Sequence, residues 1–252
     1  MHFVDPSTAP LRDLDDPMMW LGNTPMLNLE DDKLRLRVKT VLQFSHTDAA
    51  MRMRIAEYVS SIPFNVPAFA SMKRSRTTLA MRQAVGWYSK AALFMAMLRT
   101  AHFPARVRML RVPPELFRGL VDTQHQVKLP VVEVWTGTHW VATDSYLYDP
   151  LYLAAAREAL EHQGWPMGYG MHLHGVTSWN GKDEALVMIL PTRKPGSNVP
   201  LEFADIYNDP HGYVESLLNK GFFQGLWTMT RNRMLSIRMN RNVRELRRNA
   251  GG

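Results

Sequence analysis

The sequence predicts an α+β fold, in which a buried helix and a β-sheet are followed by a helical extension at the C-terminus. Residues 86–99 read GWYSKAALFMAMLR and leave almost no polar face, which is typical of a core helix. Residues 131–135 and 140–144 are short β-branched runs around a Thr-Gly-Thr-His turn, which predicts a hairpin. Near the C-terminus, apolar residues fall on one helical arc: Leu235, Met239, Val243 and Leu246.

The composition excludes several classes of chemistry. With 46% hydrophobic and 21% charged residues, the chain of 252 residues is of ordinary globular composition. It contains no cysteine, so disulfides, thiolate zinc sites, iron–sulfur clusters and thiol catalysis are excluded, and we expect no cofactor. No apolar run reaches about 18 residues, and the N-terminus lacks the pattern of a signal peptide. We therefore expect a cytoplasmic protein.

The chain divides into three predicted parts: an N-terminal arm over residues 1–45, a core over 46–195 and a basic helical extension over 196–252. The arm is rich in Pro, Asp and Met, and within it residues 34–44 fit either a strand or a short helix. The extension is expected to be helical over about 203–220 and again over about 228–248, after a linker at 191–200.

Local patterns place the remaining elements of the core. Thr47-Asp48 is a helix start for residues 49–60, and Asp149-Pro150 starts a helix that Gly164 ends. Residues 105–110 are extended, and Pro114–Leu120 is predicted to be a short helical turn. Two more strands are expected at 168–175 and 185–190. A basic run at 73–76 is predicted to lie in a loop over 65–80.

The positive charge is concentrated at the C-terminus. From residue 226 onward, seven arginines and one glutamate account for +6 of the formal charge of +7. A basic amphipathic helix suits an acidic partner, which could be a carrier protein, a nucleic acid or an anionic membrane surface. The arginines expected to contact it are Arg231, Arg238, Arg241, Arg244 and Arg248.

Three segments resemble the transglutaminase-like superfamily over about residues 50–155. In that family a Gly-x-Cys opens a helix that continues with Lys-Ala, ends in Leu-Arg and is followed by Gly-Ile-Pro-Ala-Arg. Here Lys90-Ala91, Leu98-Arg99 and Phe103-Pro104-Ala105-Arg106 match, while Glu133-Val134, Trp140 and Asp144 match the family's second segment. The resemblance implies a papain-like core, in which the nucleophile helix packs on an antiparallel sheet.

The resemblance also implies where the Cys-His-Asp triad would lie. The spacing puts Trp87 at the nucleophile position, whereas a one-residue deletion would put Tyr88 there, and it puts Leu129 in place of the histidine. Only Asp144 keeps the family's residue. Because the family reaction needs a thiolate and an imidazole, and losing either costs on the order of 10⁶ in rate, covalent acyl transfer is excluded.

Two functions remain for such a degenerate member. The first is a repurposed pocket, which binds a small, partly apolar molecule and catalyses a non-covalent cyclisation, isomerisation or elimination in a biosynthetic pathway. Asp144 would transfer the proton, with Tyr88 or His125 as further catalytic groups, and the substrate would contact Trp87, Ser89, Leu129, Glu133 and Tyr146. The second is a pseudoenzyme that acts as a binding or scaffold protein through its basic C-terminal helix. We favour the first function, because large apolar residues occupy the two reactive positions while the surrounding motifs of the family are kept.

Overall fold

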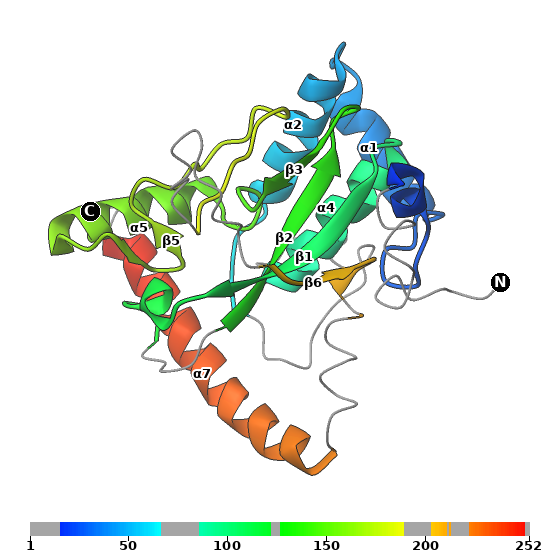
Figure 1. Cartoon of the computed structure of the whole chain (residues 1–252). Helices are drawn as coiled ribbons and strands as arrows, with labels where there is room; N and C mark the ends of the chain where they lie inside the picture. The colour runs from blue at the N-terminus through cyan, green and yellow to red at the C-terminus, as the bar shows by residue number, and fades with distance from the viewer. Residues whose placement is uncertain are drawn as a thin grey trace.

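A four-stranded antiparallel sheet forms the centre of the molecule, with the strand order β3-β2-β1-β6 (Figure 1). The computed structural model describes residues 16–66, 86–121, 127–188, 203–210, 212 and 222–249, the last segment with side chains only over 234–248. The predicted 65–80 loop, the basic run at 73–76 and the 191–200 linker lie largely or wholly outside these residues. No helix within this described part is long and apolar enough to cross a membrane.

The central helix α4 (Trp87–Thr100) begins after Gly86 and is buried along nearly its whole length. It packs against β1 (Ala105–Val112) and β2 (Val127–Trp135) on one side and against α1 and α2 on the other. A helix enclosed on both sides needs apolar residues around its whole circumference, which explains the missing polar face. The predicted core helix is confirmed.

Two further helices cover α4 on the side away from the sheet. In α1 (Asp32–Leu42) the side chain of Asp31 accepts a hydrogen bond from the amide of Leu34, and Leu34 and Val38 face inward. In α2 (Asp48–Ser60) Thr47 caps the first turn, as the sequence predicted. Residues 34–44 therefore contribute a helix to the core, the helical one of the two predicted alternatives.

The predicted hairpin joins β2 to β3 (Trp140–Thr143), with Trp135 opposite Trp140. Gly137 has φ of +105° in the turn, a conformation that favours glycine. Strand β1 pairs with β2 from Ala105 opposite Val134 to Val112 opposite Val127. The predicted helical turn after β1 is the 3₁₀ helix η3 (Pro114–Phe117), and a second one, η2 (Pro17–Leu21), precedes α1.

The region after β3 differs from the prediction. Helix α5 (Pro150–Gln163) is capped by Asp149 and ends at Gly164, as expected. Instead of two strands at 168–175 and 185–190, the chain forms the two-residue strands β4 (Met167–Gly168) and β5 (Met171–His172), which pair with each other. Ala185 forms only an isolated bridge to Thr143. Turns with positive φ at Tyr169 and Gly170 shorten these strands.

The prediction of a helix over residues 203–220 is wrong at its start. Residues Phe203–Tyr207 form strand β6, which pairs antiparallel with β1 and completes the sheet. The second predicted helix is α7 (Phe222–Asn249), which runs past α5 toward the body of the molecule in Figure 1. The α+β fold class is confirmed: a buried helix lies on an antiparallel sheet, and a long helix follows at the C-terminus.

Candidate functional site

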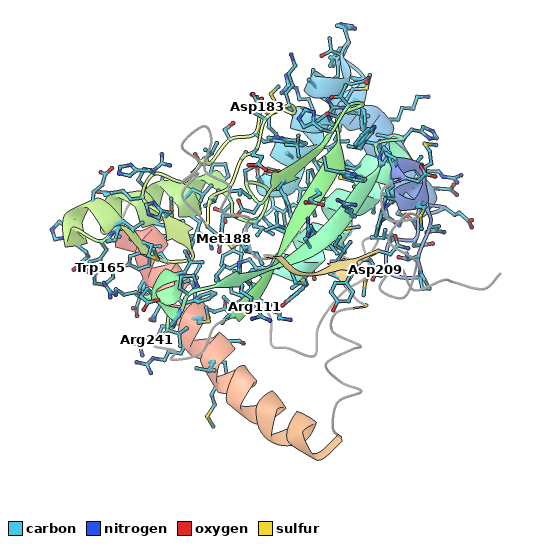
Figure 2. All side chains as sticks on the ribbon, in the orientation of Figure 1. Arg111, Trp165, Asp183, Met188, Asp209 and Arg241 are labelled. Atoms are coloured by element: carbon cyan, nitrogen blue, oxygen red, sulfur yellow. The ribbon has the colours of Figure 1, made fainter. Side chains whose placement is uncertain are left out.

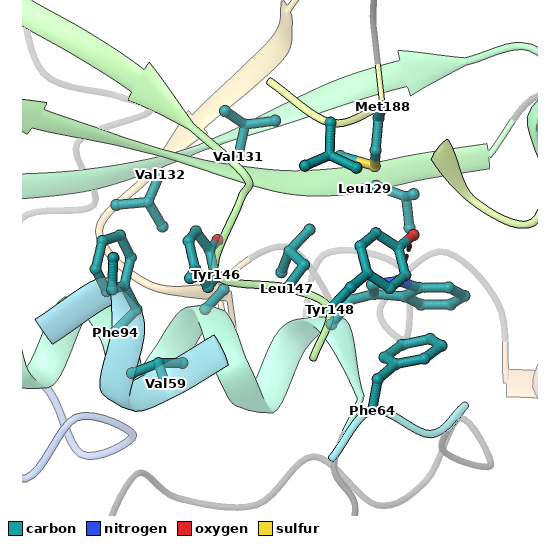
Figure 3. Close-up of a cluster of buried hydrophobic side chains, with 14 of the residues drawn as sticks. Val59, Phe64, Phe94, Leu129, Val131, Val132, Tyr146, Leu147, Tyr148 and Met188 are labelled. Carbon is teal, nitrogen blue, oxygen red and sulfur yellow. Dashed lines mark hydrogen bonds between the residues drawn. The ribbon is translucent and has the colours of Figure 1, made fainter. Parts of the chain in front are cut away.

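Trp87, one of the two residues that the resemblance puts at the nucleophile position, is the first residue of α4. The Trp87 side chain is 7% exposed, and its indole Nε1 donates a hydrogen bond to Tyr148 Oη at 3.1 Å, drawn as a dashed line in Figure 3. Its ring packs against Phe64 with 5.2 Å between ring centroids, and against Phe117 at 5.9 Å. The indole is therefore part of an aromatic cluster, held by one polar contact.

Leu129, which the resemblance puts at the place of the family's histidine, is fully buried on β2, opposite Leu110 of β1. Figure 3 shows its side chain between β2 and the aromatic cluster, close to Tyr148 and Met188. An aliphatic side chain at this position supplies packing and cannot accept a proton. The position thus belongs to the apolar core.

Asp144 follows β3 directly and is the one carboxylate at a triad place. It is 0% exposed, and its Oδ1 and Oδ2 accept hydrogen bonds from the amides of Val187 at 2.5 Å and Met188 at 3.1 Å. Burial raises the pKa of Asp144 to about 7, and the amide hydrogen bonds oppose this rise. Figure 3 shows Met188 near Leu129 and Tyr148, so the residue whose amide binds Asp144 also borders the aromatic cluster.

The other two predicted catalytic groups lie apart from Asp144 or outside the described part of the chain. Tyr88 is half-buried, and its Oη donates to the carbonyl oxygen of Lys128 at 3.0 Å. His125 lies outside the described residues. Ser89, predicted to contact substrate, is buried in α4 with 4% exposure.

Glu133 and Tyr146, the last two predicted contact residues, belong to separate clusters. Glu133 accepts hydrogen bonds from Arg106 Nε at 2.6 Å and Arg108 Nη1 at 3.1 Å, which makes it the anion of a cross-strand ion-pair network. Tyr146 stacks on Phe94 with 4.2 Å between ring centroids, and its buried Oη has no hydrogen-bond partner. Their roles as substrate contacts stay predictions.

Lys90 is a buried cation that the sequence did not single out as functional. It is 0% exposed, and its Nζ donates to the carbonyl oxygens of Ser60 at 3.3 Å and Tyr146 at 3.5 Å. Burial lowers the pKa of Lys90 to about 7, and the neighbouring Asp149 carboxylate opposes this shift. The available signal was a lysine inside a helix that otherwise lacks a polar face.

Two aromatic residues, Phe64 and Tyr148, complete the filling around Trp87. Their rings lie 4.8 Å apart, and Tyr148 stacks on Tyr152 at 5.2 Å. Neither Phe64 nor Tyr148 was among the predicted site residues. Together with Trp87 and Leu129 they form an aromatic and aliphatic cluster, with the Asp149 carboxylate bonded to the amide of Phe64.

The comparisons with known proteins agree with the motifs. Residues 37–145 match the model of the transglutaminase-like superfamily, a range that contains Trp87, Leu129 and Asp144. No curated protein sequence matches the chain.

Among solved structures, the chain is similar to the crystal structure named "a Putative Cysteine Protease from Cytophaga hutchinsonii", with 20% identity and a TM-score of 0.43. The similarity covers 57% of this chain and 47% of that one, so the chain spans about half the length of that protein. The family match therefore shows a transglutaminase-like region over residues 37–145, in a chain that contains no cysteine.

Proposed function

We propose that this chain is a catalytically inactive transglutaminase-like protein that binds an acidic protein partner through the exposed face of α7. The observation that supports the first half is Trp87, one of the two residues expected at the nucleophile's place, whose indole is buried and donates a hydrogen bond to Tyr148. A chain of 252 residues without cysteine has no thiol to replace it. Loss of a triad nucleophile costs on the order of 10⁶ in rate, so the family reaction is not retained.

The outward face of α7 supports the second half. Over residues 234–248, the inward side chains include Met239, Val243 and Leu246, and the outward side chains are mostly arginines. Figure 2 shows Arg241 projecting from α7 away from the body. These exposed cations are Arg238, Arg241, Arg244 and Arg248. Of the predicted partner contacts, only the side chain of Arg231 lies outside the described residues.

An apolar hollow next to these arginines favours a protein partner over a nucleic acid or a membrane. A hollow of about 510 Å³ is lined by Phe64, Ile237 and Val243 together with Arg244 and Arg247. Ile237 is 60% exposed, and Met234, three residues earlier on the same helix, is 73% exposed, so α7 presents two neighbouring apolar side chains beside the arginines. A protein segment can place one apolar side chain in the hollow and carboxylates beside it, whereas a phosphate backbone needs positive charge alone.

The binding test uses the full chain and a fluorescent helical peptide that carries a stripe of glutamates beside two leucines. Fluorescence anisotropy at about 50 mM salt, where charges are weakly screened, gives its Kd. Replacing all four exposed arginines of α7 with glutamine is expected to weaken binding at least ~10-fold, because several charge-assisted contacts are lost. The matched control replaces four exposed cations of α1 with glutamine and leaves the Kd within about twofold: Lys33, Arg35, Arg37 and Lys39.

Three results would contradict the proposal. The first is an equal loss of affinity in the α1 variant and the α7 variant, which would mean that only the total charge matters. An α7 variant that binds as well as the natural chain would show that the arginines do not contact the peptide. Tighter, arginine-dependent binding to duplex DNA or to phosphatidylserine vesicles would assign the face to another class of partner.

A second candidate is the repurposed pocket, and the raised pKa of Asp144 favours it. A carboxyl with a pKa of about 7 is suited to proton transfer near neutral pH, as a non-covalent cyclisation, isomerisation or elimination of a small, partly apolar molecule requires. A substrate screen that finds turnover abolished by Asp144→Asn, but kept by the exposed control Asp183→Asn, would support it. Turnover that survives Asp144→Asn would exclude Asp144 as the proton donor. For both candidate functions we propose a cytoplasmic protein, as the sequence predicts.

A further inference from the structure

A second hollow, which α7 does not line and which borders the aromatic cluster at Tyr148, has the size of a small-molecule site. It has a volume of about 340 Å³ and lies between α2, the start of α5 and residues 177–179. Known ligand sites begin at about 300 Å³, so this hollow suits a molecule with one ring. The loop that closes it is fixed at its tip, because Arg52 Nε donates to the carbonyl oxygen of Gly181 at 2.9 Å. The hollow is therefore formed by anchored elements.

The apolar part of the lining comes from Tyr148, Leu153 and Trp179. Trp179 is only 3% exposed, and its indole Nε1 donates to the carbonyl oxygen of Asp183 at 2.7 Å, which holds the ring in place. A fixed aromatic ring beside an aliphatic side chain suits a flat apolar body. One end of the ligand can thus be a ring.

The polar part of the lining is dominated by Arg157. Its Nη2 donates to the carbonyl oxygen of Gly175 at 3.1 Å, and its buried Nε has no hydrogen-bond partner. A buried donor without an acceptor costs free energy that a ligand oxygen can recover. Serine hydroxyls from Ser60, Ser145 and Ser178 line the same hollow and can add neutral hydrogen bonds.

The charges around the hollow favour an anion. The one acidic side chain in the lining is Glu57, which is exposed and already paired with Arg54 at 3.1 Å. Behind the wall, Lys90 Nζ donates to the carbonyl oxygen of Ser60. Arg157 is therefore the cation of the lining, and a hydrogen bond from a guanidinium to a carboxylate is about twice as strong as one to a neutral oxygen.

We infer that this hollow binds a small organic carboxylate with an aromatic or apolar body, with the carboxylate on Arg157 and the ring against Trp179. This goes beyond the proposed binding of an acidic protein by α7, because it uses other residues and another class of ligand. The ligand would bind without forming a covalent bond to the protein.

The test titrates the full chain with three molecules of similar size: phenylacetate, 2-phenylethanol and phenethylamine. Isothermal titration calorimetry is expected to give a Kd below about 1 mM for phenylacetate and at least ~10-fold weaker binding for the alcohol and the amine. Arg157→Gln is expected to weaken phenylacetate binding at least ~10-fold. The control Lys182→Gln removes an exposed charge from the loop that closes the hollow, at a residue outside the lining, and is expected to change the Kd less than about twofold.

A second variant keeps the inference testable if Arg157→Gln disturbs the fold. Ala154 lies on the exposed side of α5 and lines the hollow, so Ala154→Phe fills it at a position that tolerates a larger side chain. We expect this variant to unfold at the same temperature and to lose phenylacetate binding. The inference is overturned if phenylacetate does not bind, if the amine binds as tightly, or if Ala154→Phe binds phenylacetate unchanged.

Discussion

The carboxylate of Asp149 accepts a hydrogen bond from the guanidinium of Arg247, which lies 98 residues further along the chain. The same carboxylate caps α5 through the amide of Tyr152 at 3.0 Å and accepts the amide of Phe64 at 2.7 Å. Arg247 also donates to the carbonyl oxygen of Phe64 at 3.1 Å. One carboxylate thus connects the start of α5, the segment after α2 and the end of α7.

Arg247→Met should therefore loosen α7 from the core. The change leaves the Asp149 carboxylate largely buried without its cation, which typically costs about 3–5 kcal/mol. Urea unfolding followed by circular dichroism is expected to show a free energy of unfolding that is lower by this amount. The control is Arg241→Met on the same helix, whose exposed pair with Glu245 should contribute little. Equal shifts in the two variants would contradict a stabilising role for the Asp149–Arg247 pair.

The buried Lys90 should make stability rise with pH above neutrality. Its pKa is lowered to about 7 in the folded chain from 10.5, so between these values the unfolded chain binds a proton that the folded chain has released. The free energy of unfolding then increases by about 1 kcal/mol per pH unit. Lys90→Met, which cannot titrate, should remove this slope between about pH 7 and 9.5.

The measurement compares urea unfolding of the natural chain and Lys90→Met at several pH values, so that all other titrating groups cancel in the difference. Lys182→Met, at an exposed lysine, is the control and should leave the slope unchanged. A difference that stays constant with pH would mean that Lys90 titrates alike in the folded and unfolded chains.

Local patterns were sufficient for the elements that depend on neighbours in sequence. Helix α4 followed from its missing polar face, and α5 followed from Asp149 and Gly164 at its ends. Strand β6 did not follow, because Phe203–Tyr207 becomes a strand only by pairing with β1, almost one hundred residues earlier. Tertiary pairing decided its state over local propensity.

The candidate site shows the same limit. Motif spacing placed Trp87, Leu129 and Asp144, but their partners come from distant segments: Tyr148 lies 61 residues from Trp87, and the amide of Val187 lies 43 residues from Asp144. Whether a triad place is open or filled depends on such partners. The sequence could therefore predict these positions, but not the packing around them.

Trp87 should behave as a core residue. Trp87→Ala removes a large ring from the cluster with Phe64 and Phe117 and is expected to cost about 3–5 kcal/mol in the free energy of unfolding. Trp87→Phe keeps most ring packing but leaves the Tyr148 hydroxyl without its donor, at a cost of about 1–2 kcal/mol. Trp135→Ala, at a partly exposed ring on the hairpin, is the control and should cost less than Trp87→Ala. Equal costs would indicate that Trp87 lines an open space.

Asp144 should show the opposite pH dependence from Lys90. Its pKa is raised to about 7 in the folded chain from 3.8, so between these values the folded chain holds a proton that the unfolded chain has released. The stability contributed by this group is present below about pH 4 and is lost as the pH rises toward 7.

Asp144→Asn cannot titrate, and its amide NH₂ also faces the amide donors of Val187 and Met188. The variant should be less stable by about 1–3 kcal/mol at pH 4, and the difference should shrink toward pH 7. Asp183→Asn, at an exposed carboxylate, should track the natural chain. A difference that grows from pH 4 to 7 would mean that the two backbone amides outweigh burial and hold Asp144 ionised, which would leave it unable to donate a proton as the second candidate function requires.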